Sequence, residues 1–547
     1  MESIQGMHVV SGIAIGRLAF YKKPERRIDH TPALDPAAEL ARMETARAAA
    51  IAQQQALYQK ALQEAGEEIA DVFNVHAMML EDDDFVDAIR TNIQEKRMRA
   101  EYAVKTAGRA MADLFGAIED EYLRARMADV LDVAQGLIDT LQGATASIQT
   151  GEPAILAAED LSPSETVRLN KALLLGFITR GGSAISHTAI LARSMDIPAV
   201  VRSQKLDPAW DGKLAILDGT NGTLILDPDG ETLVHYRALQ EEEGLHKLLL
   251  KQMKGLANET RDGRRIELWA NIGGIEDLPA VAQNDAGGIG LFRSEFVYLG
   301  RQTPPDEETQ FRYYRQAVET MAPRRVVIRT CDLGADKTVD YLSLGHEENP
   351  ALGFRAIRIC LTKKEFFKTQ LRALLRAAAY GNLGILLPMI TSTAEVKAVR
   401  ALLEACRAEL VQEGTRVGKA ELGVMIETPA AALTADELAQ EVSFFSIGTN
   451  DLTQYTCALD RQNALLAPFS DAHHPAVLRE IKMAVEAGHR HGISVAICGE
   501  LGSDPALTET FLRMGVDELS VNPAAILPLR SAIREMDLRR GSTQKMP

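Results

Sequence analysis

The sequence predicts an α/β multidomain protein, in which an inserted α-helical subdomain interrupts one α/β domain and a (β/α)₈ barrel follows. Three observations support this prediction. Strand-like runs occur at 7–20 and again within 153–228, and the residues between them have helical composition and spacing. After residue 261, strand-like runs alternate with helical segments. A chain of 547 residues is long enough for about two to four domains.

The first α/β domain is expected to combine residues 1–20 with residues 150–232. Residues 7–20 (MHVVSGIAIGRLAF) alternate small and β-branched residues, which favours one or two strands. Similar short apolar runs predict the remaining strands, at 153–157, 173–178, 199–201, 214–218 and 223–227.

The helical subdomain is expected over residues 36–148. Alanine, glutamate, glutamine, arginine and methionine dominate this segment, and it contains no proline after Pro36. Apolar residues recur at helical spacing, as at Val72, Phe73 and Leu80, which indicates two helical hairpins. A charged linker is expected over 233–260, with a helix from His235 to Leu256.

The last domain is expected to be a TIM-like barrel over residues 261–540. Eight β/α units in a segment of this length are typical of a closed barrel. The strand candidates are Ile266–Asn271, Gly288–Phe292, Val326–Arg329, Ile385–Met389, Gly423–Ile426, Phe444–Ile447, Val495–Cys498 and Glu518–Val521.

Composition restricts the possible partners and compartments. The 60 basic and 76 acidic residues give a net charge of −16, which argues against nucleic-acid binding and is compatible with a basic protein partner. The first residues lack a basic segment followed by an apolar core, and no apolar run could span a bilayer, so no membrane insertion is expected. The five cysteines have neither disulfide nor zinc spacing, which predicts reduced thiols in a cytoplasmic protein.

One stretch, Thr179–Arg193 (TRGGSAISHTAILAR), combines a glycine turn with a single histidine before a helical segment. Glycines let a ligand approach the backbone closely, and a helix N-terminus favours an anion, so His187 could face a phosphoryl group. Ser186 is suited to cap the helix. On local grounds alone, a single histidine near a turn is more often a surface or capping residue than a catalytic one.

Polar side chains follow the predicted barrel strands where an active site is expected, at their C-terminal ends. Each of them alone has an ordinary explanation, such as a surface ion pair or a helix cap. Their recurrence at one rim predicts a site that contains Arg293, Arg329, Glu427, Asn450, Asp451, Arg461 and Cys498.

The residue types at this rim suit a small phosphorylated acid. Arginine guanidinium groups bind phosphate and carboxylate oxygens bidentately. Glu427 and Asp451 supply hard oxygen ligands for Mg²⁺, and Asn450 can bind a phosphate oxygen without adding charge. Such a set supplies the positioning and charge neutralisation that phosphoryl transfer needs. Cys498 could be a core thiol, or it could donate a proton to carbon as a general acid.

Seven segments of the chain carry motifs of one known family: GGSAISHTAI at 181–190, GLFRSEF at 290–296, IRTCDLGADK at 328–337, NPALGFRAIR at 349–358, MIETPAA at 425–431, SIGTNDLTQYTCALDR at 446–461 and CGELGSD at 498–504. In these segments the sequence closely resembles Enzyme I of the bacterial phosphoenolpyruvate:sugar phosphotransferase system, the phosphoenolpyruvate–protein phosphotransferases. The resemblance covers nearly the whole chain and includes the order of the domains.

The resemblance implies that His187 takes the phosphoryl group of phosphoenolpyruvate and passes it to a histidine of the small carrier protein HPr. It also implies that Glu427 and Asp451 ligate Mg²⁺ and that Cys498 handles the proton at the enolpyruvate methylene. The residues implied to bind phosphoenolpyruvate are Arg293, Arg329, Arg355, Asn450 and Arg461.

The resemblance further implies that Thr166 lies near the phosphohistidine, that 36–148 is the HPr-binding subdomain and that the protein is a homodimer formed through the barrel. The alternative for the carrier-binding residues is that they belong to an ordinary exposed helix face. The residues expected to contact HPr are Glu67, Glu68, His76, Met79 and Asp82.

The chain departs from the common family pattern at three places, none of which removes a catalytic group. It has Gly334-Ala335 where two glycines are common, Val10-Ser11-Gly12 in place of Ser-Pro-Gly, and Leu131 where arginine is frequent.

Two alternative functions would share part of this pattern. A pyruvate, phosphate dikinase or a phosphoenolpyruvate synthase would need a large ATP-binding domain, and no glycine-rich nucleotide loop precedes Gly151. A noncatalytic protein that senses phosphoenolpyruvate would have lost the nucleophile or a metal ligand, but His187, Glu427 and Asp451 are all present.

Overall fold

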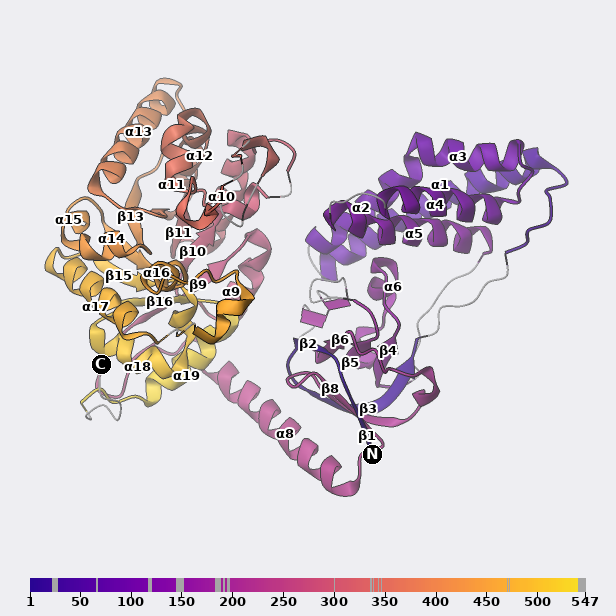
Figure 1. The fold of residues 1–547 in the computed structure, drawn as a ribbon, viewed down its shortest axis with the longest axis horizontal. Coiled ribbons are helices and arrows are strands. Elements are labelled where there is room, and N and C mark those ends of the chain that lie inside the picture. The colour runs from indigo at the N-terminus through magenta and orange to yellow at the C-terminus, as the bar shows by residue number, and fades with distance from the viewer. Residues whose placement is uncertain are drawn as a thin grey trace. The chain divides into compact units, whose positions relative to one another are not determined.

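The computed structural model describes residues 1–21, 28–64, 67–116, 121–143, 152–182, 188–189, 192–193, 197–299, 301–334, 337, 339–342, 344–345, 347–469, 471 and 473–539. The chain divides into two compact units, residues 1–247 and residues 248–547 (Figure 1). Each unit is described separately.

The first unit is built on a mixed sheet with the strand order β1-β8-β7-β3-β4-β5-β6-β2 among the described residues. β3 pairs in parallel with β4, so two neighbouring strands lie on either side of the long helical segment in the sequence. That pairing makes the helical segment an insertion into the sheet domain, as predicted. The strands are β1 (Glu2–Gln5), β2 (Met7–Val10), β3 (Ile13–Phe20), β4 (Ala154–Ala158), β5 (Leu174–Thr179), β6 (Ala199–Val201), β7 (Leu214–Asp218) and β8 (Thr223–Leu226).

The inserted subdomain is a helical bundle. Its core contains Met43, Phe85, Ile89 and Leu137, which come from three of its helices and are buried. The described helices are α1 (Pro36–Glu64), α2 (Glu67–Glu81), α3 (Asp83–Gln94), α4 (Ala100–Gly116) and α5 (Glu121–Leu141).

The bundle differs from the predicted pair of hairpins because Asp82 divides one helical run into α2 and α3. Asp82 has an extended backbone, and its carboxylate accepts a hydrogen bond from the Phe85 amide at 3.0 Å. A side-chain cap of this kind satisfies an amide that would otherwise lack a partner, so a new helix begins there.

A small apolar cluster joins the bundle to the sheet domain. Phe73 of α2 packs with Leu57 of α1 and with Val167 of α6 (Pro163–Arg168). Lys60 Nζ donates a hydrogen bond to the Val167 carbonyl at 2.7 Å. These contacts place α6 directly against the helical insertion.

A single helix, α8 (Gly230–Gln252), crosses the boundary between the units and has no buried residue. The helix predicted from His235 to Leu256 overlaps it over most of its length. No described helix combines the length and the apolar composition that a membrane crossing requires.

The second unit contains a closed barrel of parallel strands, as predicted, with the order β10-β11-β12-β13-β14-β15-β16-β9 among the described residues. Each observed strand overlaps one of the predicted strands. The strands are β9 (Glu267–Ile272), β10 (Ile289–Arg293), β11 (Arg325–Arg329), β12 (Asn382–Leu387), β13 (Ala420–Ile426), β14 (Phe444–Ile447), β15 (Ser494–Ile497) and β16 (Glu518–Val521).

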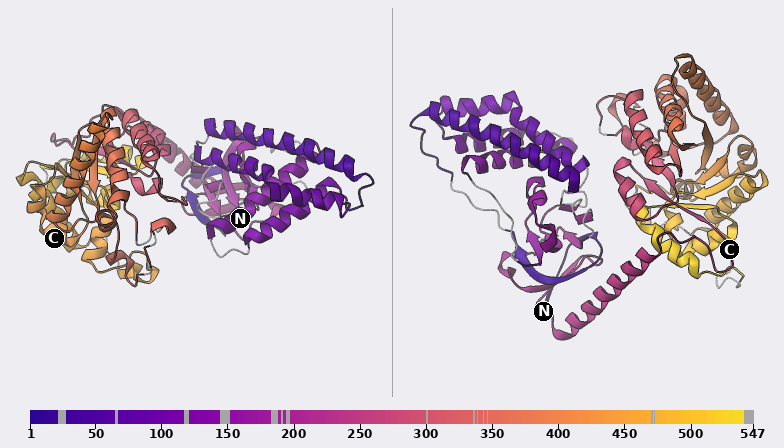
Figure 2. Two further views of the ribbon diagram at one scale, coloured as in Figure 1. Left: turned by 90° about the horizontal axis from the view of Figure 1, so that it is seen from above. Right: turned by 180° about the vertical axis from the view of Figure 1, so that it is seen from behind.

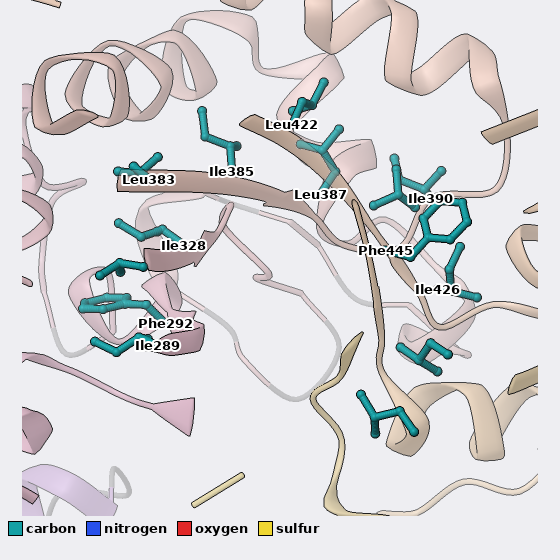
Figure 3. Close-up of a cluster of buried hydrophobic side chains, with 14 of the residues drawn as sticks. Ile289, Phe292, Ile328, Leu383, Ile385, Leu387, Ile390, Leu422, Ile426 and Phe445 are labelled. Carbon is teal, nitrogen blue, oxygen red and sulfur yellow. The ribbon is translucent and has the colours of Figure 1, made fainter. Parts of the chain in front are cut away.

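Helices surround this barrel in all the views of Figures 1 and 2. Alternate side chains of each strand point outward to them, as Figure 3 shows for Ile385 and Ile426. The principal helices are α9 (Leu278–Gln283), α10 (Glu307–Met321), α11 (Ile357–Thr362), α12 (Lys364–Ala377), α13 (Thr393–Gln412), α14 (Pro429–Leu433), α15 (Ala435–Ala439), α16 (Thr449–Thr456), α17 (Pro475–Arg490), α18 (Pro505–Met514) and α19 (Ile526–Glu535).

The interior of the barrel is filled by a separate buried cluster. Leu291, Val327, Leu386 and Met425 pack there against Cys498. Because this layer closes the interior, polar chemistry is confined to the ends of the strands.

Candidate active site

A network of buried ion pairs lies at the C-terminal ends of β10 and β11. Arg329 forms an ion pair with Glu295 and another with Asp332, whose Oδ2 lies 3.1 Å from Nη1. Lys337 Nζ lies 2.7 Å from Glu295 Oε1 and 3.3 Å from Asp332 Oδ2. The two carboxylates and the two cations therefore hold one another in place.

Arg355 extends this network to the other side of the rim. Its Nη2 donates to Asp332 Oδ1 at 3.1 Å, and its Nη1 donates to Asp451 Oδ1 at 3.1 Å and to the Tyr455 hydroxyl at 3.2 Å. Arg461 Nη1 lies 3.5 Å from Asp451 Oδ2. Burial opposes ionisation of Asp332, but the neighbouring Arg329, Lys337 and Arg355 outweigh it and lower the pKa of that carboxyl.

Glu427, at the end of β13, is only 1% exposed. Burial raises the pKa of its carboxyl to about 8, and the nearby negative charges of Asp451 and Asp332 add to the effect. The Met389 amide donates to Glu427 Oε1 at 2.6 Å, from a backbone with φ of 56°. Gly448 leaves room for the other oxygen, because a Cβ there would lie 2.8 Å from Glu427 Oε2.

Cys498 follows β15 and is buried at the same rim. Burial raises the pKa of its thiol to about 11, so the thiol carries its proton at neutral pH. The thiol lies 3.6 Å from the Ile447 carbonyl. Asn271 Nδ2 donates to the Cys498 carbonyl at 2.9 Å, and Ser520 Oγ donates to Asn271 Oδ1 at 2.7 Å.

Of the remaining rim residues, Asn450 has a side-chain partner and Arg293 does not among the described residues. Asn450 and Glu500 hold each other, since Asn450 Nδ2 donates to the Glu500 carboxylate and the Glu500 amide donates to Asn450 Oδ1, both at 3.0 Å. Arg293 ends β10 and pairs through its backbone with β11, but no side-chain hydrogen bond or ion pair joins its guanidinium to another residue in the described parts of the chain. Its guanidinium is thus not engaged by a carboxylate there.

The structure thus brings Arg329, Arg355, Asp451 and Arg461 into one network, with Glu427 electrostatically coupled to it. Sequence reasoning did not assign roles to Glu295 or Asp332. Both stand directly after strand ends, among arginines, and that position was the signal that could have identified them. The Met389 backbone amide could not be recognised in this way, because every residue other than proline has a backbone N–H.

No group of three or more His, Cys, Asp or Glu side chains poised to hold a metal occurs within the described residues. Glu427 and Asp451 supply two carboxylates. Mg²⁺ is commonly held by one or two carboxylates together with substrate oxygens and water, so this donor set suits it. Burial is the main cause of the raised pKa of Glu427, and repulsion from Asp451 adds to it; a cation bound between the two carboxylates would relieve that repulsion.

The predicted nucleophile, His187, lies outside the described residues, as does Ser186. Thr166 is described: it is buried, and its hydroxyl donates to the Pro163 carbonyl at 2.7 Å. The α6 helix that carries Thr166 begins with a reciprocal cap between Ser162 and Glu165. This cap fixes the residue at which the helix that carries Thr166 begins.

The predicted carrier contacts have different environments. Asp82 is exposed and Met79 is half-buried, whereas the side chains of Glu67 and Glu68 lie outside the described part. His76 is completely buried, with its ring nitrogens 3.8 Å from Asp129 and 3.9 Å from Asp132. As the structure has it, His76 offers no surface to a partner, and we do not propose it as a contact.

Sequence comparisons match known families along nearly the whole chain. Three family models match: "PEP-utilising enzyme, N-terminal" over residues 5–126, "PEP-utilising enzyme, mobile domain" over 150–222, and "PEP-utilising enzyme, PEP-binding domain" over 247–538. The last of these spans more than half of the chain and contains every rim residue described above.

Curated relatives match over nearly the whole length of both chains. The phosphoenolpyruvate-protein phosphotransferase of Geobacillus stearothermophilus is 40% identical over 539 residues, which cover 98% of this chain and 93% of the relative. The enzyme of the same name from Bacillus subtilis is 38% identical over 552 residues, which cover 100% and 96%. A solved structure entitled "NMR solution structure of Enzyme I (nEIt) protein using two 4D-spectra" is 31% identical and covers 44% of this chain and 99% of its own, with a TM-score of 0.39, too low to bear on the fold. On the full-length sequence matches, the chain belongs to the phosphoenolpyruvate-protein phosphotransferase family.

Proposed function

We propose that this protein transfers the phosphoryl group of phosphoenolpyruvate through His187 to a histidine of the carrier protein HPr, releasing pyruvate, as the first step of sugar uptake. Family membership supports phosphoenolpyruvate-dependent phosphotransfer. The observation that carries the proposal is the buried rim network, which gathers arginines and carboxylates at one end of the barrel.

Phosphoenolpyruvate would bind at this rim through Arg293, Arg329, Arg355, Asn450 and Arg461. Arg293 is the arginine without a carboxylate partner among the described residues, so it can accept the substrate without losing an ion pair. Glu427 and Asp451 would hold Mg²⁺, which neutralises charge on the phosphate and carboxylate oxygens during transfer. Since Asp451 also holds Arg355 and Arg461, one carboxylate links the metal position to two substrate-binding cations.

In the transfer step, the neutral imidazole of His187 attacks phosphorus through Nε2. An N–P bond forms while the P–O bond to the enolate oxygen breaks, and the enolate of pyruvate remains. The Cys498 thiol then gives its proton to the methylene carbon, forming a C–H bond and leaving a thiolate. The raised pKa of Cys498 supports this role, because a thiol that stays protonated at neutral pH can act as the acid.

The helical insertion would bind HPr. The turn between α2 and α3 is exposed and acidic, with Glu81, Asp82, Asp83 and Asp84, which suits a basic partner. Met78, which sequence reasoning passed over, is 68% exposed on α2 and would add an apolar contact. Glu67, Glu68 and Met79 remain candidate contacts, and Thr166 remains a candidate neighbour of the phosphohistidine. Homodimer formation through the barrel and a cytoplasmic location belong to the same proposal.

The test uses radiolabelled phosphoenolpyruvate, Mg²⁺ and purified HPr. The wild-type protein should label itself and then HPr, whereas His187→Ala should do neither. His246→Ala, which removes an exposed histidine of α8, is the matched control and should behave as the wild type. Transfer of label to HPr by His187→Ala would refute the proposal.

A further inference from the structure

Glu295 is a buried acid with no role in the proposed chemistry. It lies in the short turn that follows β10 and has no exposed surface. Its Oε1 accepts hydrogen bonds from Arg329 Nη2 and from Lys337 Nζ. Its Oε2 has no hydrogen-bond partner among the described residues.

Burying an ionised carboxylate costs several kcal/mol unless cations offset it. Here one oxygen is shared by two cations, so Glu295 relieves the repulsion between Arg329 and Lys337 and holds both at a fixed separation. Asp332 bridges the same two cations and also contacts Arg355. Glu295 contacts Arg329 and Lys337 but not the more distant arginines, so it can fix the positions of cations on one side of the rim only.

The backbone around Glu295 is itself held rigidly. Gln370 of α12 is fully buried, and its Nε2 donates to Ser294 Oγ at 3.0 Å. The side-chain oxygen of Gln370, Oε1, accepts a hydrogen bond from the backbone amide of Cys331 at 2.9 Å. Ser294 precedes Glu295, and Cys331 lies two residues after Arg329. One glutamine therefore ties the acid's turn to the end of the strand that carries its arginine.

We propose that Glu295 is a positioning residue for phosphoryl transfer: it orients Arg329 and Lys337 toward the anionic groups of phosphoenolpyruvate without touching the substrate. The inference rests on the proposed function of the rim. A role in positioning the cations and a purely electrostatic role make opposite predictions for the neutral variant Glu295→Gln.

Removing the negative charge beside two cations should strengthen attraction of a trianionic substrate if Glu295 merely competes with it. If Glu295 positions the cations, their misplacement should instead slow the chemistry. A displacement of about 1 Å in a catalytic group can lower a rate about 100-fold. We therefore expect Glu295→Gln to lower the single-turnover rate of His187 phosphorylation by about 10- to 100-fold, with little change in the KM for phosphoenolpyruvate.

Rapid-quench measurement of phosphohistidine formation gives the rate. The affinity is measured without turnover, by titrating phosphoenolpyruvate into the His187→Ala protein with and without Glu295→Gln. Glu421→Gln is the matched control: it removes a carboxylate 2.6 Å from Arg325 at the other end of the barrel, and it should leave both quantities unchanged. An unchanged rate in Glu295→Gln, or tighter binding with an unchanged rate, would overturn the inference.

A second pair of variants tests how Glu295 acts. Because the acid works partly through Lys337, Glu295→Gln combined with Lys337→Met should slow the reaction by less than the product of the two single effects. Independent effects would count against the inference. If Glu295→Gln does not fold, Glu295→Asp keeps the charge and withdraws the carboxylate by one methylene. The same loss of rate with retained binding is then required. Failure of the proposed function is recognised separately, by transfer from the His187→Ala protein.

Discussion

At the scale of single residues, the rim is organised by carboxylates that hold arginines before any substrate is present. Asp332 contacts three cations and Asp451 contacts two, so the guanidinium groups have few orientations left to lose when a ligand binds. Preorganisation of this kind lets polar groups stabilise a transition state without first reorganising.

Asn271 has a testable role in this organisation. Its hydrogen bond to the Cys498 carbonyl fixes the backbone of the proposed proton donor. We expect Asn271→Ala to slow exchange of pyruvate methyl hydrogens with deuterated water about three- to tenfold, the effect of losing one hydrogen bond. Proton magnetic resonance of pyruvate with the phosphorylated enzyme follows the exchange. Asn284→Ala, which removes a hydrogen bond to the Ala280 carbonyl, is the control; equal effects of the two substitutions would contradict the assignment.

Glu518 makes a prediction about pH. It lines a cavity of about 160 Å³ at the N-terminal end of the barrel, with Trp269, Arg325 and Phe444. Burial raises the pKa of its carboxyl from the usual 4.5 to about 8. Since folding raises this pKa, the cost of ionising Glu518 in the folded state is absent below pH 4.5 and grows until the pH passes about 8.

Glu518→Gln removes that cost. Its melting temperature should match the wild type near pH 4.5 and exceed it increasingly as the pH rises to about 8, by the equivalent of about 1–3 kcal/mol after allowance for water in the cavity. Calorimetry of the barrel transition across this range measures the difference. A constant difference at every pH would show that the carboxyl does not carry the shifted pKa.

Residue types at the rim were predictable from sequence, but their pairing was not. Arg329, Glu427 and Asp451 stand at strand ends, and barrel topology alone brings such ends together. The partner of each charge depends on through-space distances that no local pattern encodes. For the same reason the burial of His76 between Asp129 and Asp132 was missed, although its helical spacing beside Phe73 already placed it on an apolar face.

At the scale of secondary structure, the barrel strands were predictable because each is a short apolar run bounded by polar or glycine residues. β14 (Phe444–Ile447) and β16 (Glu518–Val521) have the predicted bounds. β1 was not predicted, because Glu2–Gln5 is mostly polar and becomes a strand only by pairing with β8. Tertiary pairing overrode a weak local preference there.

One buried arginine makes several of the contacts that attach the segment after α8 to the barrel. Arg530 of α19 is 3% exposed; its Nη1 lies 2.5 Å from Asp285 Oδ2 and donates to the Met253 carbonyl at 2.9 Å, and its Nε donates to Asn258 Oδ1 at 2.7 Å. Residues 253–258 are thus fixed to the barrel, and any bending of the linker is expected before Met253.

Arg530→Met should leave Asp285 without this partner and destabilise the barrel by about 3–5 kcal/mol. It should also speed hydrogen exchange at the Gly255 amide, which donates to Asp285 at 2.7 Å. Exchange measured by mass spectrometry of peptides spanning 253–258 provides the readout. Arg534→Met, which removes an exposed hydrogen bond to the Ala257 carbonyl, should have a much smaller effect. Equal protection in both variants would contradict this description.

At the scale of the whole molecule, the proposed nucleophile and the proposed substrate site belong to different compact units. If His187 receives its phosphoryl group at the barrel and delivers it to HPr, the units have to move between two encounters in each cycle. Relative motion is therefore part of the proposed mechanism, and it can be blocked.

Crosslinking the first unit to the barrel with a cleavable bifunctional reagent should abolish multiple turnover to HPr, and cleavage of the reagent should restore it. Crosslinks within the first unit, separated by mass spectrometry, form the control and should leave turnover intact. Unchanged multiple turnover in a population shown to be crosslinked between the units would contradict the need for motion.

The exposed helix α8 has a further consequence for the kinetics of such an enzyme. A tether sets the effective concentration of one reactant around the other, which often lies in the millimolar range for short connections. Encounter of the histidine with the barrel is then independent of how dilute the enzyme is. Dilution slows only the encounter with HPr, so the two half-reactions of a single chain respond differently to protein abundance.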